Sequence, residues 1–280
     1  MANLFAGMEA FGFDNLKDIN VYEKEKSAEG TKSDVKQPAF VEADYLFDKS
    51  FTCPVCDSEF KAKVVKVGKV KLIAADTDLR PKYQFVDSLK YDAIVCPSCG
   101  YAALNRFFNY MSARQSKAVK EQITTRFKGI ESKEDAYSYD DAIVRHKLSL
   151  MNAIVKSGKY SERAYTCLKI AWLLRGKAEN LPAETPDFEK VKASITTEEN
   201  EFISNAYEGF INAFSKESFP MCGMDENTVN YLAADLARRS GKYNEASRLI
   251  SQVLLARDAS ERIKDKARDI KEMIKDSINP

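Results

Sequence analysis

The chain has 280 residues, 44% of them hydrophobic and 30% charged, with a formal net charge of +1. This length suffices for one or two domains with a proper hydrophobic core, and the near-neutral charge excludes binding to nucleic acid or to an anionic membrane through overall charge alone. No apolar run approaches the roughly 20 residues that span a bilayer, no signal-peptide pattern is present, and six cysteines in such a chain suit a reducing compartment. These features predict a cytoplasmic protein.

The first 44 residues are predicted to form a flexible segment and linker. Leu4, Phe5, Met8, Phe11 and Phe13 could form a short amphipathic segment that docks on a partner or on the rest of the fold, or they could be scattered apolar residues of a mobile terminus. Residues 23–38 are dominated by Lys, Glu, Ser, Gly and Thr and have little to bury, which is typical of disorder.

Two short motifs, Cys53–Cys56 and Cys96–Gly100, carry the strongest chemical signal. Each begins Cys-Pro-x-Cys, and two such turns supply the four thiolates of a tetrahedral metal site. We predict that Cys53, Cys56, Cys96 and Cys99 bind one structural Zn²⁺, with iron as the alternative because soft thiolates suit both metals. Gly100, and less readily Asp57, can adopt the positive φ that is usual after such a turn. Four protein ligands leave no position for water, so the site predicts a structural role and not hydrolysis.

Alternation of apolar residues with lysines predicts a β hairpin between the two motifs. Phe60, Ala62 and Val64 alternate with Lys61 and Lys63, and Val70 and Leu72 alternate with Lys69 and Lys71. We therefore expect two strands that pair with each other through a turn near Gly68, a third strand at residues 91–95, and a zinc-ribbon-like or rubredoxin-like β module over residues 45–112. The lysine face, defined as Lys61, Lys63, Lys69 and Lys71, is either a nucleic-acid-binding face or a solvated one that protects strand edges.

Asp76, Asp78 and Arg80 form the most chemically suggestive group outside the cysteines. If their segment continues as a strand, all three side chains point to one face. They could then form a site for a cation or for a basic group of a partner. Alternatively, Arg80 neutralises both aspartates at a polar strand end, and we favour this simpler interpretation.

From Ala102 onward the apolar period is helical. Helices are expected at residues 102–110, 113–128, 133–156 and 161–175, then from a capping box at Thr196 and Glu199, and at 225–240, 244–257 and 260–276. The identical tetrapeptides Ser157–Tyr160 and Ser240–Tyr243 each lie between two of these helices, and each is followed by an alanine, Ala164 or Ala246, that permits close helix packing. Residues 113–280 therefore predict an all-α, tetratricopeptide-like helical domain, and the chain as a whole an α+β fold.

Several stretches of the chain are similar to those of a known family. They are Cys53–Cys56, Asp76–Arg80 with Pro81 and Tyr83, Cys96–Ala103, Ala171–Arg175, and Tyr231–Leu232 through Arg239 to Tyr243. In this combination, from roughly Phe51 to the C-terminus, the chain resembles a bacterial family known only as domain of unknown function 2225. The resemblance implies a metal-binding knuckle module fused to tetratricopeptide-like helices and implies no activity.

Catalysis has little support in the sequence. His146 is the only histidine, and we expect it on the solvent side of its helix, away from a stripe of Val144, Leu148, Met151 and Val155. No glycine-rich phosphate-binding loop is present. The leading hypothesis is a non-enzymatic adaptor in which the zinc module supports helices that bind a protein or peptide partner. The alternatives are a nucleic-acid-binding protein that uses the lysine face, and a rubredoxin-like redox protein.

Overall fold

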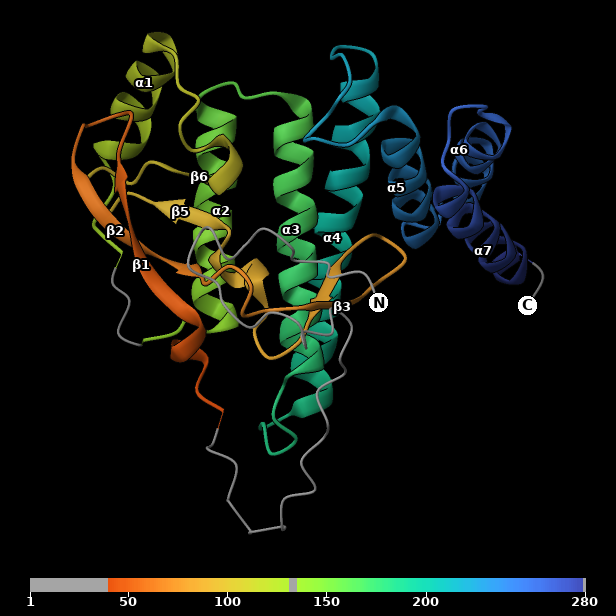
Figure 1. Cartoon of the computed structure of the whole chain (residues 1–280), viewed down its shortest axis with the longest axis horizontal. Coiled ribbons are helices and arrows are strands. Elements are labelled where there is room, and N and C mark those ends of the chain that lie inside the picture. Colours follow the sequence, from red (N-terminus) through yellow and green to blue (C-terminus); the bar gives the residue numbers. More distant parts are fainter. Residues whose placement is uncertain (1–39, 131–134, 279–280) are drawn as a thin grey trace, which may run out of the picture. The chain divides into compact units, whose positions relative to one another are not determined.

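The computed structural model describes residues 40–130 and 135–278. The strands in these ranges form three separate two-stranded antiparallel sheets. β1 (Leu46–Thr52) pairs with β2 (Glu59–Val65), β3 (Leu72–Ala75) with β4 (Pro81–Tyr83), and β5 (Ala93–Val95) with β6 (Ala102–Leu104) (Figure 1). Helices make up most of the remainder, so the predicted α+β class is confirmed. The interpretation of residues 1–39 as a docking segment or linker lies outside the described residues.

The predicted hairpin around Gly68 is wrong. β2 pairs with β1, in a register that places Phe60 opposite Phe51, and the first cysteine motif forms the turn between them. Gly68 does lie in a turn with a φ of +82°, but the strand that follows, β3, pairs with β4. The alternation of apolar residues with lysines identified β2 correctly, because it indicates a strand with one buried face. The same alternation does not say which other strand pairs with it.

Seven α-helices occur in the described chain. α1 (Ala113–Val119) runs directly into a π-helical turn at Lys120–Thr124, and the longer helices are α2 (Tyr139–Val155), α3 (Tyr160–Glu179), α4 (Phe188–Phe214), α5 (Glu226–Arg239), α6 (Tyr243–Leu255) and α7 (Glu261–Ile278). From α2 onward, each helix packs against the next one along the chain (Figure 1). In the described ranges no helix combines the length and the apolar character that crossing a membrane requires.

Two helix predictions are wrong. Residues 102–110 contain β6 and a short 3₁₀ helix (Asn105–Phe107), because Ala102–Leu104 completes the hairpin around the second cysteine motif. The expected capping box at Thr196 lies inside α4, where the Thr196 hydroxyl donates to the carbonyl of Lys192 and Glu199 accepts from Arg175. Neither side chain caps a helix, so the Thr196 and Glu199 pattern does not mark the start of α4.

The two identical tetrapeptides occupy equivalent turns, one between α2 and α3 and one between α5 and α6, as predicted. The left-handed residue differs between them: it is Ser157, at φ +52°, in the first turn and Gly241, at φ +72°, in the second. Ala164 and Ala246 are both buried. At Ala164, α3 and α4 approach so closely that a Cβ on Gly209 would lie 2.8 Å from the Ala164 Cβ, so this contact requires small residues on both helices.

Of the three apolar clusters among the described residues, two surround the long helices and the cysteine motifs. The larger cluster is built on α3, whose Leu168, Ile170 and Leu173 are fully buried and which packs between α2 and α4. The smaller cluster surrounds the cysteine motifs and includes Tyr101 and Phe108. The cysteines therefore lie in an apolar environment of their own.

Candidate metal centre

Each cysteine motif forms the tip of a hairpin, and the two tips have the same backbone bonding. In the first, the Cys53 N–H donates to the carbonyl of Ser58 at 3.0 Å and the Asp57 N–H donates to the carbonyl of Cys53 at 2.9 Å. In the second, Cys96 and Gly100 make the corresponding bonds, to Tyr101 at 2.8 Å and to Cys96 at 3.0 Å. Because the two turns have the same backbone hydrogen bonds, each holds its pair of sulfur atoms in the same geometry, which suits one tetrahedral ion shared between them.

The residue after the second cysteine of each motif has a positive φ, as predicted: 60° at Asp57 and 74° at Gly100. Gly100 has a second reason to be glycine, because a Cβ there would lie 2.5 Å from the ring of Phe127. Asp57 instead tolerates the left-handed conformation at some cost in free energy, which aspartate bears better than most residues.

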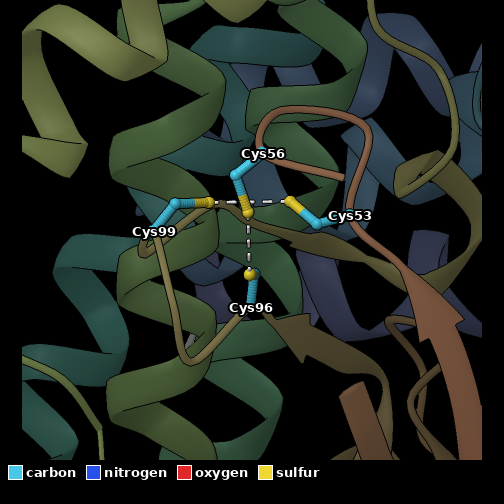
Figure 2. Close-up of side chains that lie close together, drawn as sticks. All are labelled: Cys53, Cys56, Cys96 and Cys99. Atoms are coloured by element: carbon cyan, nitrogen blue, oxygen red, sulfur yellow. Dashed lines mark hydrogen bonds between the residues drawn. The ribbon is translucent and has the colours of Figure 1, made fainter. Parts of the chain in front are cut away.

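The four sulfur atoms converge on one point (Figure 2). The Cys53–Cys99 and Cys56–Cys96 Sγ–Sγ distances are 3.6 and 3.7 Å, and all four sulfurs lie within 4.8 Å of one another. A tetrahedral ion with metal–sulfur bonds of about 2.3 Å needs sulfur–sulfur edges of about 3.8 Å. Cys53, Cys96 and Cys99 are buried and Cys56 is half-buried. The cluster can therefore hold a metal ion through four thiolates.

Charge within the cluster favours a cation. Interaction with Cys53 lowers the pKa of Cys96, whereas interaction with Cys96 raises the pKa of Cys53 and interaction with Cys53 raises that of Cys99. The neighbouring cysteines thus stabilise the Cys96 thiolate, but they oppose ionisation of the Cys53 and Cys99 thiols beside it. A divalent ion would offset the repulsion between these thiolates, because it attracts all four sulfurs and displaces their protons.

The second motif is tied to the helices by side-chain hydrogen bonds. Asn152, on α2, donates to the carbonyl of Gly100 at 3.0 Å, and the Thr124 hydroxyl donates to the carbonyl of Cys99 at 3.0 Å. Both carbonyls would otherwise be buried acceptors without a partner. Whether residues 45–112 form a unit separate from residues 113–280 stays a prediction, but these bonds cross the expected boundary.

Asp76 and Asp78 lie in a turn between β3 and β4, not on a continuing strand, and Leu79 in this turn has a φ of +66°. Their main partner is Arg175 on α3, which donates to Asp76 at 3.0 Å and to both oxygens of Asp78 at 3.1 and 2.7 Å. Arg80 instead donates to Glu179 at 2.9 Å and lies 3.6 Å from Asp76. The expectation that Arg80 neutralises both aspartates is therefore wrong: Arg175 bonds both, whereas the Arg80 side chain approaches only Asp76.

The same turn is bonded directly to α5 and, through Arg175, is linked to α4. Arg175 Nε donates to Glu199 at 2.7 Å, Tyr231 donates to the carbonyl of Thr77 at 2.6 Å, and Thr77 donates to Asp235 at 2.8 Å. Asp78 and Asp235 are fully buried. Although burial alone would raise the pKa of Asp78, the hydrogen bonds and charge of Arg175 lower it below its ordinary value.

The sequence did not reveal which helical residues bind this turn, namely Arg175, Asp235 and Arg239. Arg175 and Arg239 belong to stretches that carry the family resemblance, so a signal existed, but it did not say that these stretches meet. The contacts explain the charges of Asp76 and Asp78. A role for Asp76, Asp78 and Arg80 as a binding site stays a prediction.

The four residues of the lysine face fall on two elements. Lys61 and Lys63 project from β2, and Lys69 and Lys71 lie in the loop after it. Lys63 lies 3.9 Å from Asp48. Nucleic-acid binding by these lysines stays a prediction.

His146 is not on the solvent side of α2, and that expectation is wrong. It is fully buried, and its Nδ1 lies 2.7 Å from the carbonyl of Ala142. Burial lowers its pKa to about 4, so the ring is neutral at pH 7. The exposed face of α2 instead carries Val144 and Met151, because the buried face must meet β5, β6 and Gly100 with small and polar side chains such as Ala142 and Asn152.

Comparison with known proteins gives a family but no characterised relative. No curated protein and no solved structure matches the chain significantly. One family does match, over residues 46–274, a range that contains both cysteine motifs, the Asp76–Arg80 turn and most of the helices. The chain belongs to this family, which is described as an uncharacterized protein conserved in bacteria (DUF2225).

Proposed function

We propose that this protein is a zinc-stabilised, non-enzymatic adaptor whose C-terminal helices bind an extended peptide of a partner protein. In this proposal residues 45–112 form a zinc-ribbon-like module, residues 113–280 pack as tetratricopeptide-like hairpins, and the protein works in the cytoplasm. Support comes from a closed Cys₄ cluster, which suits a structural ion, and from two pairs of packed neighbouring helices, α2–α3 and α5–α6, each joined by a glycine-containing turn.

The observation that carries the proposal is a cavity of about 660 Å³ formed by α4, α5 and α6. Its apolar lining includes the half-buried Ile211, Phe214 and Phe219 and the buried Leu249. Its polar lining includes Asn227 and Asn230 from α5 and Arg248 and Gln252 from α6, beside the carboxylates of Glu226 and Asp258. Side-chain amides donate and accept at once, so they can bond the backbone of an extended peptide, while the apolar residues receive its side chains.

Zinc is proposed over iron because four thiolates with no open position suit a structural ion that undergoes no redox change. Metal analysis of freshly purified protein, together with its visible spectrum, tests this part. We expect one colourless equivalent of zinc per chain. Iron with a thiolate charge-transfer band would instead favour the rubredoxin-like alternative.

Selection from a displayed random-peptide library tests the partner site. Peptides enriched on the wild-type protein should bind Asn230→Ala or Arg248→Ala at least about tenfold more weakly, because each variant removes one anchoring group. Lys275→Ala on α7, which is exposed and does not line the cavity, should bind them normally. Enriched peptides that bind all three variants equally would place the partner site elsewhere and refute the proposal.

A further inference from the structure

A small cavity of about 180 Å³ lies between β2, the second cysteine motif and α2. Lys61 and Lys63 enter it from β2, Pro97 from the cysteine motif, and Tyr137 and Arg145 from the segment that leads into α2 and from α2 itself. Lys61 and Lys63 are two residues apart on one strand, so they share a face of the β1–β2 sheet. Asp48, which lies opposite Lys63 on β1, is the one carboxylate among the described residues that line the cavity.

Arg145 is the unusual member of this group. Only 6% of its surface is exposed, and its Nε is buried without a hydrogen-bond partner. Within residues 40–130 and 135–278, no carboxylate oxygen lies within 4.0 Å of its guanidinium. Its guanidinium lies 4.2 Å from the ring centre of Tyr137, which in turn stacks on Tyr91 at 5.1 Å. The ring faces attract the cation but accept no directed N–H bonds as an oxyanion does.

A buried cation without an anionic partner is costly in a folded protein, because the guanidinium has lost water and gained little in return. Lys63 does not share this problem, since Asp48 lies 3.9 Å away. Among the described lining residues, three cationic side chains therefore face one carboxylate, and that carboxylate is 56% exposed to water. The described residues that line the cavity carry a net charge of +2, and its volume suits one small anion.

We propose that this cavity binds a phosphate group through Arg145, Lys61 and Lys63. A phosphate dianion matches the net charge, and its several oxygens can accept from a planar guanidinium and from two ammonium groups at once. Tyr137 fixes the plane of the guanidinium before the ligand arrives. This site is separate from the cavity between α4, α5 and α6, and it does not depend on the adaptor proposal.

Thermal unfolding and titration calorimetry of the metal-loaded full chain test the site, with inorganic phosphate as the probe and ionic strength held constant with sodium chloride. Phosphate should raise the Tm of the wild type, because it binds only the folded protein. Arg145→Met and Lys61→Met should each weaken phosphate binding about tenfold or more. Asp48→Asn should tighten it several-fold, since it removes the only opposing charge among the described lining residues.

Two further measurements separate binding from effects on folding. Lys69→Met removes an exposed lysine outside the cavity and should bind phosphate as the wild type does. Arg145→Met should be at least as stable as the wild type in phosphate-free buffer, because it removes a buried charge that has no carboxylate partner among the described residues, and this outcome also shows that the variant folds. A purely structural arginine would instead leave the variant unstable both with and without phosphate.

The source of the phosphate is tested with a short oligouridylate at the same ionic strength. Binding that Arg145→Met weakens would assign the site to the backbone of a nucleic-acid strand; binding of inorganic phosphate alone would assign it to a small free phosphate. Both results support the site. The proposal is overturned if phosphate has no effect on the wild type beyond that of sodium chloride, or if Arg145→Met binds it equally well.

Discussion

Arg175 is the residue whose removal we expect to be most costly outside the cysteine cluster. It is the bidentate partner of Asp78, which has no exposed surface, and it also bonds Asp76 and Glu199. Replacing it with methionine keeps the length of the side chain but leaves Asp78 as a buried charge, with Arg239, at 3.8 Å, as the remaining cationic side chain within 4.0 Å among the described residues. Breaking a buried ion pair in this way costs about 3–5 kcal/mol. Arg175→Lys keeps the charge but loses the planar fork, and should cost about 1–2 kcal/mol.

The pH dependence of this loss distinguishes charge from packing. The pKa of Asp78 in the folded wild type is lowered, so its contribution to stability is complete above its unfolded pKa of about 3.9 and is lost as the pH falls through the folded value. Without Arg175, burial favours the protonated carboxyl and raises that pKa. The difference in unfolding free energy between the wild type and Arg175→Met should therefore be largest near pH 7 and narrow as the pH falls toward about 4.

Urea unfolding of the metal-loaded protein at several pH values measures both quantities. Arg268→Met is the matched control, because Arg268 pairs with Glu261 and Asp265 on α7 and its side chain is 54% exposed. An exposed pair of this kind contributes at most about 1 kcal/mol. A loss for Arg175→Met that is no larger than for Arg268→Met, or one that does not change with pH, would refute the assignment of Arg175 as the charge that neutralises the turn.

Three other outcomes follow from the described contacts. The double variant Cys53→Ser/Cys56→Ser should bind no metal and should melt at a lower temperature, which metal analysis and calorimetry check; an unchanged Tm would contradict a structural ion. Gly100→Ala should lower the free energy of unfolding by more than about 1 kcal/mol, because of the positive φ and the nearby Phe127 ring. Asp57→Gly should leave it unchanged or raise it by up to about 1 kcal/mol. Equal effects of the two variants in urea unfolding would contradict this explanation. Because the pKa of His146 is about 4 when folded and about 6.5 when unfolded, stability should fall by about 3 kcal/mol as the pH drops between these values, and His146→Gln should remove that slope.

The cysteine cluster could be predicted from the sequence because its signal is local. Each Cys-Pro-x-Cys turn places two sulfurs by itself, and two such turns leave little choice of partner. Most of the long helices could be located for a related reason: a 3.6-residue period reports a buried face without saying what covers it. Gly100 could be assigned a positive φ from its place after the motif, although its contact with Phe127 could not be foreseen.

What could not be predicted depends on contacts between distant residues. Arg175 is 97 residues from Asp78, and a sequence with many arginines does not say which one fills a buried site. The face of α2 was misread for a similar reason. Its apolar side chains Val144 and Met151 suggested a core face, but the helix packs on a hairpin that leaves room for small residues and needs Asn152 as a hydrogen-bond donor.

The three hairpins are stabilised by different contacts among the described residues. An isolated two-stranded hairpin is marginally stable, and none of these three extends into a larger sheet. β5–β6 is fully buried and packs on α2, whereas β1 and β2 are largely exposed or half-buried and end in the first cysteine motif. The strands β3 and β4 are joined by the Asp76–Arg80 turn, which Arg175, Tyr231 and Asp235 hold against the helices.

This difference predicts how loss of the metal propagates. β1–β2 should depend on a bound metal most, because Cys53 and Cys56 at its tip would share that ion with Cys96 and Cys99 of the second motif. β3–β4 depends on Arg175 and should be insensitive to the metal. Amide hydrogen exchange after chelation should therefore accelerate in β1 and β2 while the turn at residues 76–80 remains protected, and Arg175→Met should give the reverse pattern. Equal acceleration of both hairpins in both experiments would mean that the metal centre and the ion pairs stabilise one cooperative unit and not two separate attachments.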